Sequence, residues 1–355
     1  MAREIDHSRW KRAYLSEIDR YAQMLPGRVL NAVFFGGGTP SLMAPETVAS
    51  VLSAVRAAWP VSNDLEVTLE ANPGSVDSER FRAFAEAGIS RVSMGVQALN
   101  DHDLRRLGRI HTVKEAREAF EVARMCFDRV SFDLIYARQD QTIKDWKAEL
   151  REALSMAIDH LSLYQLTIEP GTSFGDRYAC GKLKGLPIDE TAAEMYETTQ
   201  EICAYAGLPA YEVSNHAKPG SESRHNLIYW RYGDYIGIGP GAHGRITRHG
   251  QRHATEAWAM PERWLNGVDN DTAEKPPIAL SGVDQATEYL LMGLRVSEGI
   301  DMARYKRLAG QAIDAQALFD LQDIGMVIVN GSRLQATEKG RIVLNSVIGE
   351  LLREY

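Results

Sequence analysis

The chain has 355 residues, of which 45% are hydrophobic, and a formal net charge of −8 at pH 7. That apolar content is enough for a large globular core, while the acidic balance argues against a nucleic-acid partner held by bulk electrostatics. No stretch is apolar over the roughly 18 residues that a membrane span needs, and the first residues lack the apolar centre of a signal peptide. We therefore expect a cytoplasmic protein with at most transient membrane association.

The first predicted element is one amphipathic helix over about residues 6–25. Its apolar side chains recur at helical spacing: Trp10, Tyr14, Ile18, Tyr21 and Leu25. An apolar run of strand length then leads into three glycines, a threonine and a proline at 36–40. Glycines free the backbone of side chains where a strand emerges, so this turn is either a tight connection to the next helix or a place where a ligand approaches.

A strand-then-helix pattern repeats after this turn. Strands are predicted at 31–35, 65–69, 91–96, 130–135 and 161–168, and a helical segment follows each of the first four. Such repeats indicate a parallel sheet. The expected fold is α/β, a partial (β/α) barrel that lacks its first strand, because the chain opens on a helix. The glycine strand would then be an unpaired edge, and we expect low solubility.

Polar residues stand at the carboxyl ends of the predicted strands: Thr39, Glu70, Gln97, Asp133 and Gln165. Ligands of barrel folds bind at those ends. One such residue can simply cap the next helix, but a set that converges on one rim favours a polar small-molecule site.

The regular pattern fades after Pro170. A helix is predicted over 189–206 and a strand over 210–213, whereas 245–282 reads as irregular, with Pro276-Pro277 as a linker. The tail predicts helices at 285–294, 302–308 and 315–323, a hairpin turn at Asn330-Gly331, and a last helix from Thr337. This is a small winged-helix-like module, for which we expect a packing role because it has no basic recognition helix.

The predicted domains are residues 1–175 (partial barrel), 176–280 (barrel extension) and 281–355 (C-terminal domain). The three cysteines, Cys126, Cys180 and Cys203, are too few and too far apart for a disulfide framework or a closely spaced metal clip. Cys126 and Cys203 lie in apolar helical patterns, which favours buried thiols.

A set of motifs resembles one known family. They are Gly36–Pro40, Glu70–Pro73, Gly95–Gln97, Arg109, Phe132–Tyr136, Tyr164–Pro170, His225–Trp230 and Gly237–Gly244. In order and spacing they are similar to the radical S-adenosylmethionine family of oxygen-independent coproporphyrinogen oxidase-like proteins, and most of all to its haem chaperone branch. The resemblance runs from about residue 9 to the C-terminus, and its tail is similar to that family's C-terminal domain.

The resemblance implies an S-adenosylmethionine site. Gly37, Gly38 and Thr39 would hold the methionine amino group together with Glu70. Arg109 would pair with the methionine carboxylate as a planar fork on a planar anion. The two remaining residues, Gln97 and Asp133, would bond the ribose hydroxyls.

The chain departs from the family in two places. The C-x3-C-x2-C motif that holds the family's [4Fe–4S] cluster is absent, so no residue is predicted to bind metal or to be catalytic, and enzymatic activity stays open. We favour a truncated chain over a genuine cluster-less relative. In addition, Ala137–Thr142 stands where the family usually has Gly-Leu-Pro, which leaves the conformation of that loop open.

The segment His225-Asn-Leu-Ile-Tyr229-Trp230 combines an imidazole with aromatic rings, as haem sites do. In the haem chaperone branch this motif is associated with haem, so His225 is the predicted ligand, with His216 and His243 as alternatives. The predicted function is that of a haem chaperone that delivers haem to a respiratory acceptor protein. Two alternatives stay open: radical decarboxylation of coproporphyrinogen, and a binding-only remnant. Which protein accepts the haem is not predicted, and the chain is a possible dimer.

Overall fold

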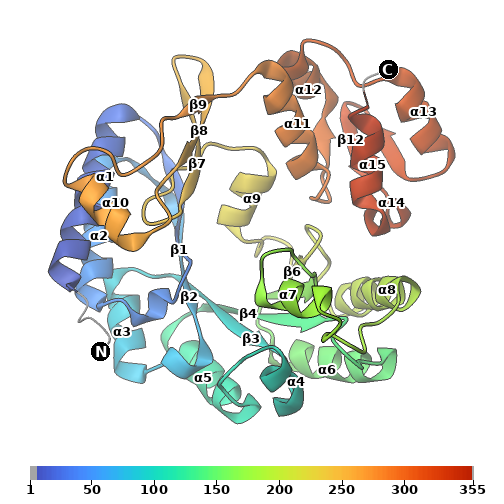
Figure 1. The fold of residues 1–355 in the computed structure, drawn as a ribbon, viewed down its shortest axis with the longest axis horizontal. Coiled ribbons are helices and arrows are strands. Elements are labelled where there is room, and N and C mark those ends of the chain that lie inside the picture. The colour runs from blue at the N-terminus through green and yellow to red at the C-terminus, as the bar shows by residue number, and fades with distance from the viewer. Residues whose placement is uncertain (1–5, 354–355) are drawn as a thin grey trace.

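The structure, a computed structural model, describes residues 6–353. Its centre is a six-stranded sheet in the order β1-β2-β3-β4-β5-β6. These strands are β1 (Leu30–Phe35), β2 (Val61–Ala71), β3 (Arg91–Gln97), β4 (Arg129–Tyr136), β5 (His160–Gln165) and β6 (Asn215–Ala217). The first five are parallel and β6 is antiparallel to β5. The sheet curls as in Figure 1, which confirms the predicted partial barrel.

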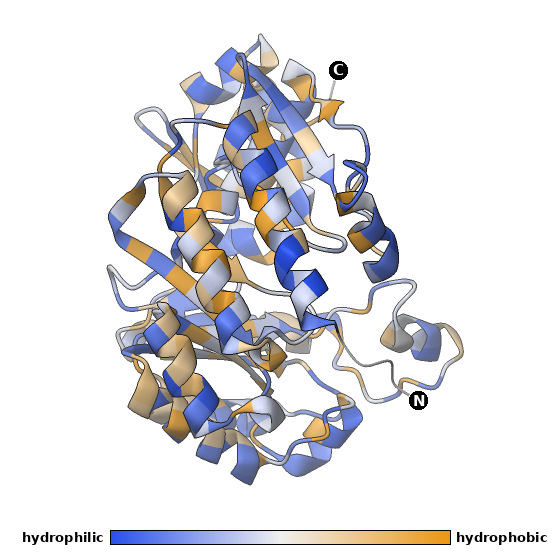
Figure 2. Cartoon of the chain, turned by 90° about the vertical axis from the view of Figure 1, so that its left-hand side faces the viewer, coloured by the Kyte–Doolittle hydropathy of each residue, from blue (hydrophilic) through white to orange (hydrophobic). Residues whose placement is uncertain are grey.

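Helices cover the outer face of this sheet. They are α1 (His7–Met24), α2 (Pro45–Ala58), α3 (Ser78–Ala87), α5 (Val113–Cys126), α6 (Ile143–Met156) and α8 (Asp189–Tyr205). The main core contains buried side chains from the strands and from α2, α3, α5, α6 and α8, while α1 packs on α2 around Ile18 and Tyr21. Figure 2 faces the α1 side and shows hydrophobic and hydrophilic segments alternating along the long helices, as amphipathic helices require.

Shorter elements join these parts. They are the 3-10 turns η1 (Pro40–Leu42) and η2 (Pro73–Ser75), and the helices α4 (Asp101–Arg106), α7 (Ser173–Ala179) and α9 (Arg224–Trp230). Helix α9 contacts β1 and lies on the inner side of the curled sheet, opposite the covering helices (Figure 1). In residues 6–353 no helix is both long and apolar enough to cross a membrane.

The strand predicted at 210–213 is wrong. The Tyr211 N–H donates to the Asn215 carbonyl at 3.1 Å, and the Tyr211 carbonyl accepts from the Ser297 N–H at 2.9 Å. The chain therefore folds back here in a turn. The buried Glu212 carboxylate stabilises that turn by accepting from the Ser214 N–H at 3.1 Å. The strand is instead β6, which follows the turn.

The prediction that residues 245–282 are irregular is also wrong. A second sheet, in the order β7-β8-β9, runs through this region, with β7 (His243–Arg248), β8 (Gln251–Glu256), β9 (Ile278–Ala279) and helix α10 (Pro261–Val268). The hairpin turn is His249-Gly250, where both residues have positive φ, 49° and 79°. Charged residues dilute the apolar alternation of β7 and β8, and His-Gly is a weaker turn signal than Asn-Gly.

The C-terminal region has its own core of buried residues. Its elements are α11 (Gly282–Gly293), β10 (Ile300–Asp301), α12 (Met302–Ala309), α13 (Ala315–Asp323), β11 (Val327–Asn330), β12 (Arg333–Ala336), α14 (Glu338–Ile342) and α15 (Leu344–Leu351). The predicted hairpin at Asn330-Gly331 joins β11 to β12. The single helix predicted from Thr337 onward is instead two helices, α14 and α15. The proposed domain boundaries at residues 175 and 280 stay predictions.

Candidate functional site

The inner face of the sheet is polar because the strands alternate. In β3, Val92, Met94 and Val96 are buried in the helix-covered core, so Ser93, Gly95 and Gln97 lie on the other side. The same alternation places these polar residues on the inner face: Glu66, Thr68 and Glu70 of β2, Ser131 and Asp133 of β4, and His160, Ser162 and Tyr164 of β5. Only the members at strand ends, Glu70, Gln97 and Asp133, were predicted from the sequence.

The glycine turn is pinned to the end of β2. The Gly37 N–H donates to the Glu70 carboxylate at 3.0 Å, and the Asn72 amide donates to the Thr39 hydroxyl at 3.2 Å. Gly37 and Gly38 have φ of 77° and 61°, and no atom lies within 4 Å of where a Cβ would be. The turn therefore exposes its backbone beside a carboxylate, which suits a ligand carrying an amino group.

Two acidic groups of this site, Glu70 and Asp133, interact electrostatically. Burial raises the pKa of Asp133 to about 7, and the negative charge of Glu70 contributes to that rise. Burial also raises the pKa of Glu70, while the Gly37 bond lowers it. Arg109 lies close enough to counteract the rise at Asp133. A cationic ligand with hydroxyl groups would relieve the repulsion between the two acids.

Gln97 is held in a conformation that few non-glycine residues adopt. Its φ is 76°, and its side-chain nitrogen lies 3.1 Å from where a Cβ on Gly95 would be. Strain of this kind persists only where the surroundings enforce it, and it concentrates at binding sites. The bulge between Met94 and Gln97 in the pairing of β3 with β4 accompanies it.

Gln165 does not belong to this set. It is in register with Tyr136, whose ring stacks on Trp146 of α6 with centroids 5.1 Å apart, so Gln165 lies on the helix side of the sheet. Its neighbour Tyr164 faces inward, where burial raises its pKa and the charge of Asp133 adds to the rise. The prediction placed Gln165 correctly at the end of a strand, but its side chain is on the opposite face of the sheet from the site.

The predicted haem ligand, His225, is in the first turn of α9 beside β1. Its side chain is 11% exposed, and its ring is stacked on Phe34 with centroids 4.1 Å apart. Its Nδ1 lies 2.9 Å from the Ser223 hydroxyl and 3.5 Å from the Glu66 carboxylate. Burial lowers the pKa of His225, and Glu66 partly offsets this.

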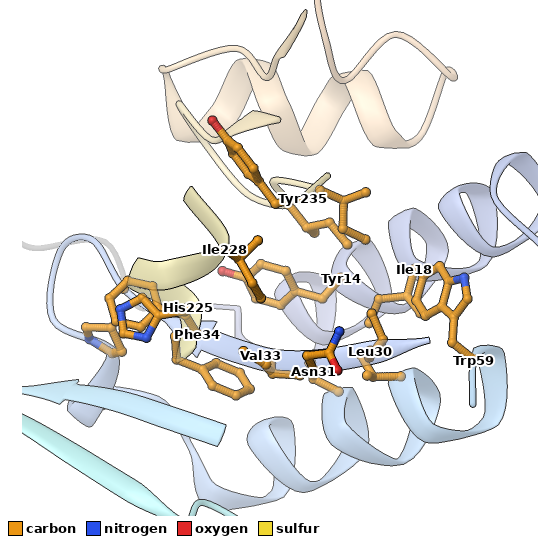
Figure 3. A pocket seen from close by; sticks show the side chains of 18 of the residues that line it. Tyr14, Ile18, Leu30, Asn31, Val33, Phe34, Trp59, His225, Ile228 and Tyr235 are labelled. Atoms are coloured by element: carbon orange, nitrogen blue, oxygen red, sulfur yellow. The ribbon is translucent and has the colours of Figure 1, made fainter. Parts of the chain in front are cut away.

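A cavity of about 520 Å³ extends along β1 and reaches His225. Its wall is largely apolar and aromatic, as Figure 3 shows; the labelled residues include Tyr14, Ile18, Trp59, Ile228 and Tyr235. The ring of Tyr229 also lines it and meets Tyr235 edge-on with centroids 4.6 Å apart. Gly37 and Thr39 of the glycine turn also line the cavity, so it extends to the polar site.

The two alternative histidines are placed differently. His216 of β6 is 1% exposed, and neither of its ring nitrogens has a hydrogen-bond partner among the described residues. No ligand can reach it without opening the sheet. His243, the first residue of β7, is exposed, but it is not among the residues that line the cavity.

The three cysteines lie in or just after three different helices and form no cluster. Cys126 ends α5, Cys180 is exposed just after α7, and Cys203 is buried in α8, where burial raises its pKa to about 12. Between residues 6 and 353 no group of three or more His, Cys, Asp or Glu side chains is placed to hold a metal ion. The residues present therefore do not fit a thiolate-bound cluster.

The loop that departs from the family pattern is well fixed. Ala137 and Asp140 have positive φ, 56° and 58°. The buried Arg138 guanidinium donates to Asp103 at 2.8 Å and to Glu149 at 2.6 Å. This ion network anchors the loop between α4 and α6, on the helix side of the sheet.

Comparisons with known proteins agree with this architecture. Residues 3–153 match the radical SAM superfamily, and residues 280–343 match the HemN C-terminal domain. Radical S-adenosyl methionine domain-containing protein 1, mitochondrial, of Danio rerio is 39% identical over 338 residues, covering 92% of this chain and 76% of the relative. Heme chaperone HemW of Escherichia coli is 35% identical over 356 residues, covering 99% of this chain and 92% of the relative.

Among solved structures, coproporphyrinogen III oxidase (HemN) from Escherichia coli superimposes with a TM-score of 0.80 at 21% identity, covering 99% of this chain and 84% of that one. This similarity establishes the shared fold, and the relatives at higher identity establish the family. The chain belongs to the radical S-adenosylmethionine superfamily, within the coproporphyrinogen oxidase-like group that contains the haem chaperone HemW.

Proposed function

We propose that this chain binds haem through His225, binds S-adenosylmethionine at the polar inner site, and delivers the haem to a respiratory acceptor protein. The observation that carries the proposal is the position of His225. Its imidazole lines an aromatic cavity, and its Nε2 has no hydrogen bond to any described residue. Neutral imidazole is a common axial ligand of haem iron, and the relatives named heme chaperone HemW support this assignment.

The residues around the glycine turn fit S-adenosylmethionine. Gly37, Gly38 and Thr39 offer open backbone and a hydroxyl group, and Glu70 would bind the amino group of the methionine. Arg109 would pair with its carboxylate, and the ribose hydroxyls would bond to Gln97 and Asp133. The sulfonium charge would also be favoured between the two acids whose repulsion raises the pKa of Asp133.

Decarboxylation of coproporphyrinogen is the alternative function. It needs electrons from a [4Fe–4S] cluster, for which the described cysteines are not arranged. We therefore expect the purified chain to release no CO2 from coproporphyrinogen under anaerobic conditions with iron, sulfide and reductant. Measurable release would favour the oxidase.

An anaerobic haem titration followed in the Soret region tests the proposal. Wild-type protein is expected to saturate at one haem per chain, and His225→Ala to bind at least about tenfold more weakly, since an axial bond is lost. His243→Ala is the matched control, because His243 is not among the residues that line the cavity. Equal binding by wild type and His225→Ala, or no binding by either, would overturn the proposal.

Delivery is tested separately by mixing the haem-loaded chain with a haem-free respiratory protein and separating the two. Transfer that depends on His225 supports delivery. Loss of haem to serum albumin at the same rate as to the respiratory protein would mean simple dissociation.

A further inference from the structure

Helix α9 begins without a cap of its own. The N-cap residue, Ser223, makes no side-chain bond to the following N–H groups. The cap comes instead from the sheet. The Glu66 carboxylate of β2 accepts from the Arg224 N–H at 2.9 Å and from the backbone N–H of His225 at 3.5 Å. A single residue therefore holds the start of the haem-motif helix against the sheet.

Glu66 is itself fixed in place. Its side chain is 3% exposed, and Arg129 of β4 contacts its other oxygen at 2.8 Å. Arg129 also donates to Asp159, the residue before β5, at 2.9 Å, so the Glu66 carboxylate is buried in a charge network that runs from β2 to β4 and on to the start of β5. Burial tends to raise the pKa of Glu66, but His225, Arg91 and Arg129 lower it to about 2. Its ion pair with the Arg129 guanidinium, 2.8 Å away, keeps it a carboxylate, which can only accept hydrogen bonds.

Three side chains contact the imidazole of His225. Phe34 stacks on one face of the ring, while the Ser223 hydroxyl and the Glu66 carboxylate both approach Nδ1. The Ser223 hydroxyl, 2.9 Å from Nδ1, can donate or accept, whereas the Glu66 carboxylate, 3.5 Å from Nδ1, can only accept. The carboxylate therefore favours the tautomer that carries its proton on Nδ1. The lone pair is then on Nε2, the nitrogen without a protein partner.

We propose that Glu66 is a positioning residue for His225, holding its imidazole as the Nδ1–H tautomer with the Nε2 lone pair available to haem iron in the cavity along β1. The effect of Glu66 on haem binding rests on the proposed function, whereas its effect on the His225 tautomer does not. Histidines that ligate metals commonly donate their other ring N–H to a carboxylate, which fixes the tautomer and raises ligand basicity.

Long-range 1H–15N NMR of 15N-histidine-labelled, haem-free protein at about pH 8 reads the tautomer directly. The His225 signals are assigned by their loss in His225→Ala. Wild type is expected to show the Nδ1–H form, and Glu66→Gln a mixture or the Nε2–H form, since the amide can also donate. An Nε2–H wild type would overturn the proposal even if the variant failed to fold.

The haem titration gives the second readout. Glu66→Gln is expected to weaken haem binding by about tenfold or more, with a changed Soret maximum. The control is Asp64→Asn, which removes an exposed carboxylate that pairs with Arg224 on the same helix and should alter neither readout. Wild-type tautomer and affinity in Glu66→Gln would overturn the proposal.

The two hypotheses can fail independently. If His225→Ala binds haem normally while Glu66→Gln changes the tautomer, the proposed haem ligand is wrong and the positioning contact is right. If His225→Ala loses haem while Glu66→Gln leaves the tautomer unchanged, the ligand is right and the role of Glu66 is wrong.

Discussion

The ring of His225 lies nearly parallel to that of Phe34, with centroids 4.1 Å apart and planes inclined by 19°. The contact joins α9 to the edge strand β1, so the orientation of the imidazole depends on both. Phe34→Leu keeps an apolar side chain but removes the stacked ring. We expect it to lower the free energy of unfolding by about 1 kcal/mol and to weaken haem binding.

Urea unfolding and the haem titration check this prediction. Phe120→Leu is the control, because it breaks another ring pair, Phe120 with Phe132, whose centroids are 5.2 Å apart in the main core. It should lose stability without losing haem affinity. The same loss of affinity in both variants would mean that general destabilisation, and not the stack, is responsible.

The pH dependence of stability should report on Asp133. Its pKa in the folded protein, about 7, is above the value of about 3.9 for an unfolded chain, so the folded state binds more protons between these values. Stability from this group is therefore lost as pH rises from about 4 to 7. Asp133→Asn should remove that loss and raise the free energy of unfolding at about pH 8, on the order of 2–4 kcal/mol.

Urea titrations at about pH 5 and pH 8 compare wild type, Asp133→Asn and the exposed control Asp128→Asn. The difference in the free energy of unfolding between the two pH values should be smaller than in wild type only for Asp133→Asn. An unchanged difference would show that Asp133 titrates alike in the folded and unfolded states.

The Ala137 backbone offers a stabilising change. Its φ of 56° costs an L-residue roughly 1–2 kcal/mol, whereas glycine adopts it freely. Ala137→Gly should raise the free energy of unfolding by up to about 0.5 kcal/mol, because the entropy that glycine adds to the unfolded chain and the loss of a methyl group buried in the main core offset part of the relief. Ala148→Gly, in the exposed middle of α6, should lower it by about 1 kcal/mol. If thermal and urea unfolding show that both variants are destabilised, or that both are stabilised, the strained backbone at Ala137 is not the cause.

Binding of S-adenosylmethionine should depend on the shape of the Arg109 side chain as well as its charge. Arg109→Lys keeps the charge but loses the planar fork that matches a carboxylate, so we expect about tenfold weaker binding by calorimetry. Arg105→Lys, on the exposed side of α4, should bind like wild type. Equal affinity in both variants would remove Arg109 from the site.

The open edge of β1 predicts self-association. This strand pairs only with β2 in the described sheet, and none of its residues is buried. Edge strands with free N–H and C=O groups pair with other chains, and lysine on such an edge blocks pairing. Asn31→Lys should reduce association in light scattering, whereas Gln316→Lys on α13 should not. A monodisperse wild type that melts cooperatively would contradict this prediction.

The parallel strands and their helices could be predicted from the sequence, because each has apolar residues that recur at strand or helix spacing. It also placed Glu70, Gln97 and Asp133 near one rim. It could not reveal that Glu66 meets His225, because 159 residues separate them and no local pattern encodes that contact. The inner polar row is visible in the sequence as alternation in residues 66–70 and 129–133, whereas a rule based on strand ends finds only its last members.

The sheet-supplied cap of α9 also sets an order of assembly. A helix of seven residues is too short to persist in water by itself, and its first N–H groups bond to a carboxylate from a strand made much earlier in synthesis. The imidazole therefore becomes ordered only once the central strands have associated and the chain has been made beyond residue 230. A nascent or partly unfolded polypeptide would present a mobile histidine with little selectivity for haem, which couples cargo capture to completed folding.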